Sequence, residues 1–136
     1  MRLFTTLLII IYSSITAASN CDIKEFDNFY SQFKTDKKFA DNHTIFPLRL
    51  ASWEYGIDTD GKDVSSKTVN YVSSSNDIEL LSLFLKKNGL TDKITSKNAE
   101  RTSVLIFEQG TDLQISYHFI CHKNQWALYE IEDKSV

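Results

Sequence analysis

The chain begins with a largely apolar run, Leu3 to Ile15, which follows a single arginine and leads into the small residues Thr16 to Ser19. A basic start, a short apolar centre and a small-residue end are typical of a secretory signal peptide. The run is also shorter than the roughly 20 apolar residues that a membrane-spanning helix requires. We therefore expect cleavage of residues 1–18, so that residues 19–136 act as an exported protein, periplasmic or secreted.

Aromatic residues then recur at positions i, i+3, i+4 and i+7 within residues 22–34. They are Phe26, Phe29, Tyr30 and Phe33. Polar side chains fill the positions between them, so the pattern predicts an amphipathic helix with one aromatic face. Because each ring buries a large apolar area, this face indicates core rather than a cofactor site. Residues 36–42 should either extend this helix or form a short second helix that carries Phe39.

After residue 44 the apolar positions alternate with a period of two, which predicts a strand over residues 45–55. One side of it carries Phe46, Leu48 and Leu50, and the other carries Arg49, Ala51 and Trp53. Pro47 cannot donate a ladder hydrogen bond, so it should lie at the strand's beginning, at an edge or at a bulge. Residues 58–61 have turn composition and lack the closing glutamate of a calcium loop. A second strand is expected over residues 67–72.

A third helix is predicted between Asn76 and Gly89. Asn76 and Glu79 have the spacing of a capping box, and a glycine commonly ends a helix. The expected buried face consists of Leu80, Leu81, Phe84 and Leu85. Residues 91–101 are mostly polar, and we interpret them as a connector.

The last part of the chain predicts a three-stranded antiparallel meander over residues 103–109, 112–122 and 125–132, because short turns separate the three segments. Alternation in the middle strand assigns five residues to the core face: Leu113, Ile115, Tyr117, Phe119 and Cys121. The opposite face carries Gln114, Ser116, His118 and His122. Helices followed by an antiparallel meander indicate an α+β fold in a single domain, residues 19–136.

Net charge argues against a nucleic-acid partner. Removing Arg2 with the signal peptide leaves fourteen basic against eighteen acidic side chains, a net charge of −4. The basic pairs Lys37-Lys38 and Lys86-Lys87 are isolated, whereas phosphate binding requires clustered lysines and arginines.

Cys21 and Cys121 are the two cysteines of the chain. In an exported protein an even number of cysteines favours a disulfide, and closing so long a loop would stabilise the fold by about 4 to 5 kcal/mol. The alternative is a lipoprotein anchored through Cys21, although Ala18-Ser19-Asn20 is a poor lipobox. The absence of a C-x-x-C pair argues against redox catalysis.

We expect no metal and no cofactor. His118 and His122 are four residues apart in a strand, about 13 Å, too far to ligate one ion. There is also no nucleophile elbow of the kind that positions a catalytic serine.

Several segments together resemble the nuclear-transport-factor-two-like (cystatin-like) superfamily. They are Phe26-x-x-Phe29-Tyr30-x-x-Phe33, Asp36-x-x-Phe39, Ile45-Phe46-Pro47-Leu48 and Gln125-Trp126-x-Leu128-Tyr129-x-Ile131-x-Asp133. The chain is similar to an exported, uncharacterised branch, for which we suggest the family of domain of unknown function 4348. The resemblance implies helices packed on a strongly curved antiparallel sheet, a cone whose mouth holds a ligand, a catalytic dyad or a partner protein. We match no acid/base dyad to interior positions of this sequence.

The leading hypothesis is a non-enzymatic binding module for a partner protein or a small apolar ligand, such as an immunity or inhibitor protein. Trp53, Arg49 and Tyr71 are the candidate contact residues, because such residues concentrate binding energy at interfaces. Six apolar residues would form either packed core or a pocket: Phe29, Phe33, Phe46, Leu48, Phe84 and Phe119. The alternatives are a small hydrolase or isomerase that uses Tyr117 or His118, and a lipid-anchored envelope protein.

Overall fold

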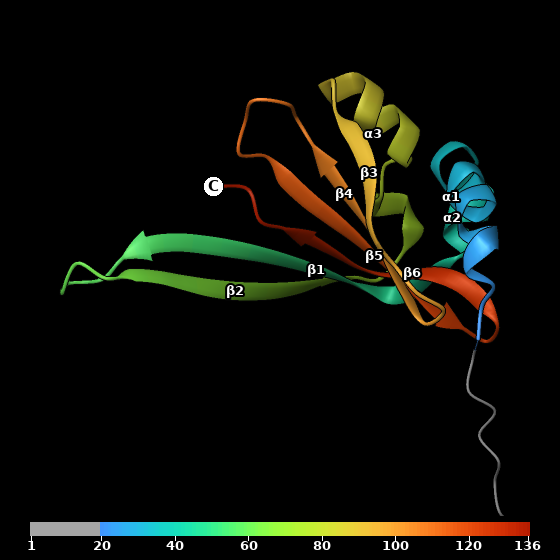
Figure 1. Cartoon of the computed structure of the whole chain (residues 1–136), viewed down its shortest axis with the longest axis horizontal. Helices are drawn as coiled ribbons and strands as arrows, with labels where there is room; N and C mark the ends of the chain where they lie inside the picture. Colours follow the sequence, from blue (N-terminus) through green and yellow to red (C-terminus); the bar gives the residue numbers. More distant parts are fainter. Residues whose placement is uncertain (1–19) are drawn as a thin grey trace, which may run out of the picture.

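The computed structural model describes residues 20–136, and the predicted signal peptide lies outside these described residues. The helices are α1 (Phe26–Thr35), α2 (Lys37–Asn42) and α3 (Leu81–Asn88), with short 3-10 turns at Ile23–Glu25 and Ser75–Asp77. The strands are β1 (Thr44–Ile57), β2 (Asp63–Val72), β3 (Thr91–Lys97), β4 (Arg101–Phe107), β5 (Gln114–His122) and β6 (Gln125–Asp133). The three helices pack on one six-stranded sheet, which confirms the α+β class (Figure 1).

The sheet has the strand order β2-β1-β6-β5-β4-β3. Strands β3 to β6 pair with their sequence neighbours in antiparallel fashion, so the predicted meander is confirmed and gains a fourth strand. The sheet is mixed rather than purely antiparallel, because β1 pairs with β6 in parallel.

Strand β3 corrects the interpretation of residues 91–101 as a connector. Its inward positions carry Asp92, Ile94 and Lys97, so only one of them is apolar. The two charged residues are paired with helix α1, through Lys34 at 2.8 Å and Asp27 at 3.0 Å. Ion pairs replace apolar burial here, which is why hydrophobic alternation does not signal this edge strand.

The start of α3 also differs from the prediction. Residues 75–77 close as a 3-10 turn, and α3 begins at Leu81 without a side-chain cap. Glu79 pairs with Lys87 instead of reaching back to Asn76. The helix ends at Gly89 as predicted, and this glycine has a left-handed φ of 65°.

The aromatic face of α1 forms the centre of the core. Phe26, Phe29, Tyr30 and Phe33 are all buried, as predicted. Each of them contacts the ring of Phe119 from β5, with centroids 5.1 to 6.0 Å apart. Edge-to-face contacts of this kind add to the burial of apolar area.

A disulfide joins Cys21, just before α1, to Cys121 near the end of β5, with the Cα atoms 5.7 Å apart. Both cysteines are buried. A sulfur in a disulfide cannot also carry a lipid, so this bond opposes the alternative of an anchor on Cys21. The buried disulfide is consistent with an oxidising, exported compartment. Among the described helices none is both long and apolar enough to cross a membrane.

Strands β1 and β2 form a long hairpin that projects from the rest of the sheet (Figure 1). They pair over ten positions, from Leu48↔Val72 to Ile57↔Asp63. Strand β6 pairs with β1 only as far as Ser52↔Asp133. Residues 53–67 therefore form a two-stranded extension, which we call the arm. Pro47 lies near the start of β1, where the pairing with β6 changes register, in agreement with the prediction.

Candidate functional site

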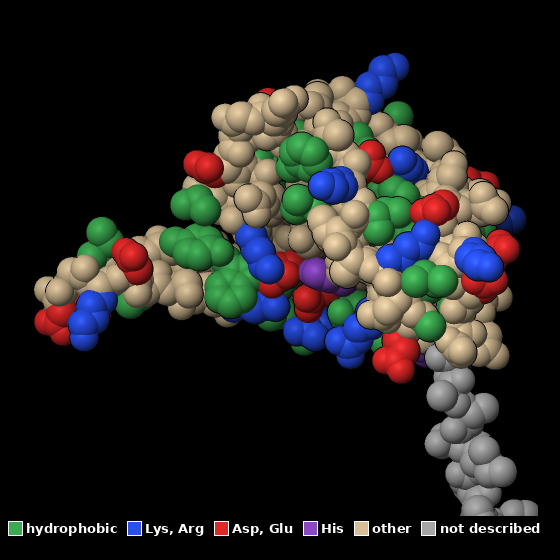
Figure 2. Space-filling model, viewed as in Figure 1, with side chains coloured by type: hydrophobic (Ala, Val, Ile, Leu, Met, Phe, Trp, Pro, Cys, Tyr) green, Lys and Arg blue, Asp and Glu red, His purple; other side chains and the backbone are tan. Residues whose placement is uncertain are grey.

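Four strands place a polar row on the sheet face opposite the helices, which we call the outer face. Arg49 of β1 lies opposite Glu130 of β6, and Glu130 lies opposite His118 of β5. Ser103 of β4 lies opposite His118 and completes the row. Residues in register share a face, so these side chains can pair across the sheet. Figure 2 shows acidic, basic and histidine side chains gathered at the base of the arm.

Two glutamates at the centre of this cluster are almost buried, since Glu130 and Glu132 are only 7% and 6% exposed. The guanidinium of Arg49 lies 3.2 Å from the Glu130 carboxylate. The ammonium groups of Lys67 and Lys134 each lie 3.2 Å from the Glu132 carboxylate. A buried carboxylate is costly unless it is paired and hydrogen-bonded, so these three cations compensate both glutamates.

Glu132 accepts hydrogen bonds from two further side chains. The indole Nε1 of Trp53 donates to it at 2.7 Å, and Nε2 of His118 lies 3.1 Å from its other oxygen. Burial alone would raise the pKa of Glu132, but the hydrogen bonds from Trp53, His118 and the two lysines lower it to about 2. The carboxylate is therefore ionised near neutral pH and fixes the position of Trp53.

His118 connects Glu132 to Ser103. An ionised carboxylate can only accept, so Nε2 donates to Glu132, while Nδ1 lies 2.8 Å from the Ser103 hydroxyl. Ligand atoms of His118, Glu130 and Glu132 also lie within 4.8 Å of one another. A metal ion there would have to displace the cationic side chains that already neutralise both carboxylates. The charge balance therefore favours the ion pairs with Arg49, Lys67 and Lys134 over a bound metal ion.

The structure places the three candidate contact residues, Arg49, Trp53 and Tyr71, on the outer face. Tyr71 lies opposite Arg49 and is 61% exposed. The ring of Trp53 stacks on that of Tyr55, with centroids 6.5 Å apart. The ammonium of Lys67 lies 5.7 Å from the centroid of the Trp53 ring. At the base of the arm, the ring of Trp53 thus contacts both an aromatic and a cationic side chain.

Sequence reasoning missed Glu130 and Glu132. The available signal was the alternation of two glutamates with apolar residues in a strand that otherwise supplies core, from Trp126 to Ile131. Arg49 meets Glu130 only because β1 and β6 pair in parallel, and no local pattern specifies that pairing.

The six residues expected to form core or a pocket lie in the packed interior. Phe29, Phe33, Leu48 and Phe119 are buried, and Phe46 and Phe84 are partly buried against them. A cavity of about 20 Å³ borders this interior, between Phe33, Tyr117 and Leu128 among others. Such a volume has room for about one water molecule, so the interior around these residues is filled.

Tyr117 and His118, the alternative catalytic residues, are not brought together. They are neighbours in β5, so Tyr117 faces the helices and His118 faces outward. Burial raises the pKa of Tyr117 to about 12, with the charge of Glu79 as a second cause. Tyr117 therefore stays protonated near neutral pH and cannot act there as a base.

Comparison with known proteins connects the chain to others through its fold. No family model matches the chain, and no curated protein does. A solved structure of an NTF2-like protein from Bacteroides fragilis matches with a TM-score of 0.53 and 21% identity, over 82% of this chain and 47% of that one. The chain thus spans about half the length of the Bacteroides protein.

A second solved structure, an NTF2-like protein of unknown function from Methylobacillus flagellatus, matches with a TM-score of 0.38 and 11% identity. The match covers 82% of this chain and 86% of that one. The narrower assignment to the family of domain of unknown function 4348 stays a prediction. At these identities the likeness concerns the fold alone: the chain has an NTF2-like α+β fold.

Proposed function

We propose that this chain is a non-enzymatic, exported binding module that holds a partner protein at the arm and the adjoining outer face. The observation that carries the proposal is the arm itself, because a two-stranded ribbon without further support is marginally stable in water. Beyond Ser52 the two strands of the arm pair only with each other among the described strands. A partner that packs on the arm would supply the missing support.

The arm exposes apolar side chains that a folded domain normally covers. Tyr55 is 50% exposed, Ile57 is 72% exposed and Val64 is 46% exposed. Strand β2 lies at the edge of the sheet that the described residues form, and within that sheet one row of its backbone donors and acceptors is free to pair with another chain. Exposed apolar side chains and an open strand edge are both features that protein partners use.

The base of the arm supplies the residue types that concentrate energy in interfaces. Trp53 is held by Glu132, Arg49 is held by Glu130, and Tyr71 projects beside Arg49. Because Trp53 and Arg49 are already fixed in the free protein, a partner would lose little entropy in ordering these two side chains. An immunity or inhibitor protein that binds a toxin or enzyme outside the cytoplasm is the concrete form of this proposal.

Native mass spectrometry of the protein purified from its own envelope, without reductant, tests the proposal. The wild type should carry a second protein at a fixed ratio, and the double variant Tyr55→Ser/Ile57→Ser should have lost it. Leu83→Ser is the matched control, because Leu83 is 56% exposed on α3 and lies outside the arm. A partner retained by the arm variant, or lost equally by the control, would contradict the assignment to the arm.

A small hydrolase is the second candidate, favoured by the hydrogen bonds that run from Glu132 through His118 to Ser103. Acid, imidazole and hydroxyl in this order resemble an activated nucleophile. Ser103 lies between β3 and β5 and pairs with both strands, so the surrounding backbone offers little for an oxyanion hole. Ester hydrolysis by the wild type that Ser103→Ala abolishes would favour this candidate, and equal rates in both would exclude Ser103 as nucleophile.

A further inference from the structure

Strand β2 forms one edge of the sheet, and β3 forms the other. The ten residues of β2 pair with β1 in one continuous register, from Leu48↔Val72 to Ile57↔Asp63. On its other side β2 has no neighbouring strand among residues 20–136. Every second residue of β2 therefore offers one backbone donor and one backbone acceptor to a further strand.

The turn that closes the arm shows which residues of β2 point to the open side. The amide of Asp58 donates to the carbonyl of Lys62 at 2.9 Å, so these two residues form a hydrogen-bonded pair. Such pairs alternate with non-hydrogen-bonded pairs along an antiparallel ladder, so the even-numbered residues of β2 bond to β1. The residues whose backbone groups point to the open edge are Asp63, Ser65, Lys67, Val69 and Tyr71.

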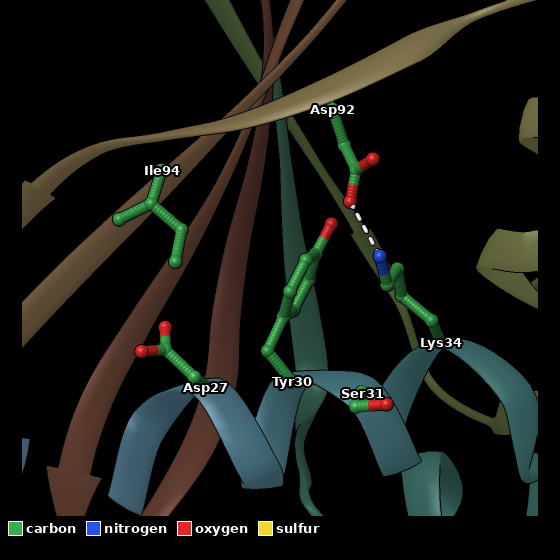
Figure 3. A pocket seen from close by; sticks show the side chains of 6 residues that line it. All are labelled: Asp27, Tyr30, Ser31, Lys34, Asp92 and Ile94. Carbon is green, nitrogen blue, oxygen red and sulfur yellow. Dashed lines mark hydrogen bonds and ion pairs between the residues drawn. The ribbon is translucent and has the colours of Figure 1, made fainter. Parts of the chain in front are cut away.

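The edge at β3 is protected in ways that the edge at β2 is not. A register shift between Ile94 and Ser96 interrupts its ladder with β4, and its seven residues include two lysines. Bulges and lysines are devices that keep a strand edge from pairing with another chain. Figure 3 shows the ion pair of Lys34 with Asp92, which joins β3 to helix α1. Of the two edges, β2 is therefore the one open to pairing.

The outer face beside β2 carries one more positive than negative charge in its polar cluster. The cations of this cluster are Arg49, Lys67 and Lys134, and its carboxylates are Glu130 and Glu132. Lys67 lies on β2 itself, and its side chain is 31% exposed. An ammonium has three donors, so Lys67 can bond to Glu132 and to an acidic side chain of another chain at the same time.

The edge becomes apolar beyond Lys67. Val69 and Tyr71 follow it on the same face of β2; Val69 is partly exposed, and Tyr71 is 61% exposed. Opposite charges and apolar side chains stabilise neighbouring strands when they lie across from one another. A matching segment therefore has an acidic side chain opposite Lys67 and apolar or aromatic side chains opposite Val69 and Tyr71.

A second copy of this chain matches the edge less well than a different protein does. In the two antiparallel registers that centre on β2, Lys67 would lie opposite either Lys67 or Val69 of the other copy. The first register brings like charges together, which destabilises a sheet. The second places a charge opposite an apolar side chain. Neither register supplies the acidic side chain that complements Lys67.

Resting on the proposed function, we propose that the partner protein binds by strand addition. An extended segment of the partner pairs with residues 63–71 of β2 and adds a seventh strand to the six-stranded sheet. Its backbone bonds to the groups that point to the open edge, an acidic side chain of the segment pairs with Lys67, and apolar side chains contact Val69 and Tyr71. The arm thereby gains the third strand that residues 20–136 do not supply.

Residue-resolved amide exchange, followed by NMR of the isotope-labelled, disulfide-bonded protein, tests this mode of binding. In the free protein the amides of Ser65 and Lys67 should exchange faster than those of Ser66 and Thr68, which bond to β1. In the complex with the protein recovered from the envelope, the amides of Ser65 and Lys67 should slow to the rate of their neighbours. Equal exchange of odd and even amides in the free protein, or edge amides that stay fast in the complex, would overturn the strand addition.

Ser65→Pro removes one edge donor and leaves the bonds to β1 in place, since proline is tolerated where the N–H of an edge strand faces outward. It should weaken binding of the recovered partner roughly three- to tenfold, the value of one hydrogen bond. Ser65→Ala is the matched control: it loses the same hydroxyl, keeps the amide and should bind like the wild type. Both variants should have the same thermal midpoint; a lower midpoint in Ser65→Pro would mean that this amide bonds to β1.

Carbodiimide treatment of the complex should join Lys67 to an aspartate or glutamate of the partner, and a contacting segment without an acidic residue would overturn the chemistry assigned to it. Strand addition is wrong, and the arm site stands, if Ser65→Pro keeps wild-type affinity while Tyr55→Ser/Ile57→Ser loses the partner. If the wild type carries no second protein, the proposed function fails and strand addition fails with it. Recovery of a second copy of this chain alone would overturn the class of partner.

Discussion

Replacing Glu132 by glutamine tests whether this buried carboxylate stabilises the fold through its charge. The pKa of Glu132 is about 2 in the folded protein, against 4.5 for an ordinary glutamate. Because one pKa unit corresponds to about 1.4 kcal/mol, the ionised carboxylate contributes on the order of 3 kcal/mol to the free energy of unfolding. The folded pKa is the lower one, so this contribution is complete above about pH 4.5 and is lost as the pH falls through about 2.

Urea unfolding of the disulfide-bonded protein at pH 7 and pH 3 measures this contribution. Between these two pH values, protonation linked to Glu132 alone should cost the wild type about 2 kcal/mol. Glu132→Gln has no carboxyl to titrate, so its loss of stability over the same range should be about 2 kcal/mol smaller. Glu54→Gln, at an exposed position of β1, is the control and should keep the wild-type pH dependence. An equal loss in Glu132→Gln and wild type would refute the reasoning.

Four further predictions concern the fold and the cluster. Reduction of the Cys21–Cys121 disulfide should lower the free energy of unfolding by about 4 to 5 kcal/mol, because it closes a loop of 100 residues; a change below about 1 kcal/mol in urea would contradict this. Phe119→Ala should cost about 3 to 5 kcal/mol in the same assay, since the ring is fully buried, and a near-neutral effect would mean that the core is loosely packed. Gly89→Ala should lower stability by about 1 kcal/mol because its φ is 65°, although a Cβ there meets no neighbour; an unchanged thermal midpoint would argue against the αL cap. Trp53→Phe removes the donor to Glu132 and should cost about 1.5 to 3 kcal/mol and raise the carboxyl pKa, which side-chain NMR can follow; an unaltered pKa would contradict the bond.

Local patterns were sufficient wherever neighbours in sequence are also neighbours in space. The aromatic spacing from Phe26 to Phe33 specifies α1, and the short turns specify the meander, because both depend on contacts within a few residues. The helix stop at Gly89 is equally local. The Cys21–Cys121 disulfide was predicted from the signal-peptide pattern and the even number of cysteines, because disulfides form in the oxidising compartments outside the cytoplasm.

The features that the sequence did not reveal depend on contacts between distant segments. Residues 91–97 look like a connector because the partners of Asp92 and Lys97 lie on α1, more than fifty residues earlier. The cluster around Glu130 and Glu132 arises from the parallel pairing of β1 with β6. Strand β2 begins at Asp63 rather than at residue 67 as predicted, since its polar serines give no apolar alternation.

Hydrogen–deuterium exchange of the arm amides tests the central proposal most directly. In the free protein, amides of residues 53–57 and 63–67 should exchange faster than those of β4 and β5, because no third strand among residues 20–136 supports the arm. In the complex recovered from the envelope, these amides and those near Arg49 and Tyr71 should become protected, while α3 should be unchanged. A complex in which the arm exchanges as fast as in the free protein would contradict the assignment of the partner site.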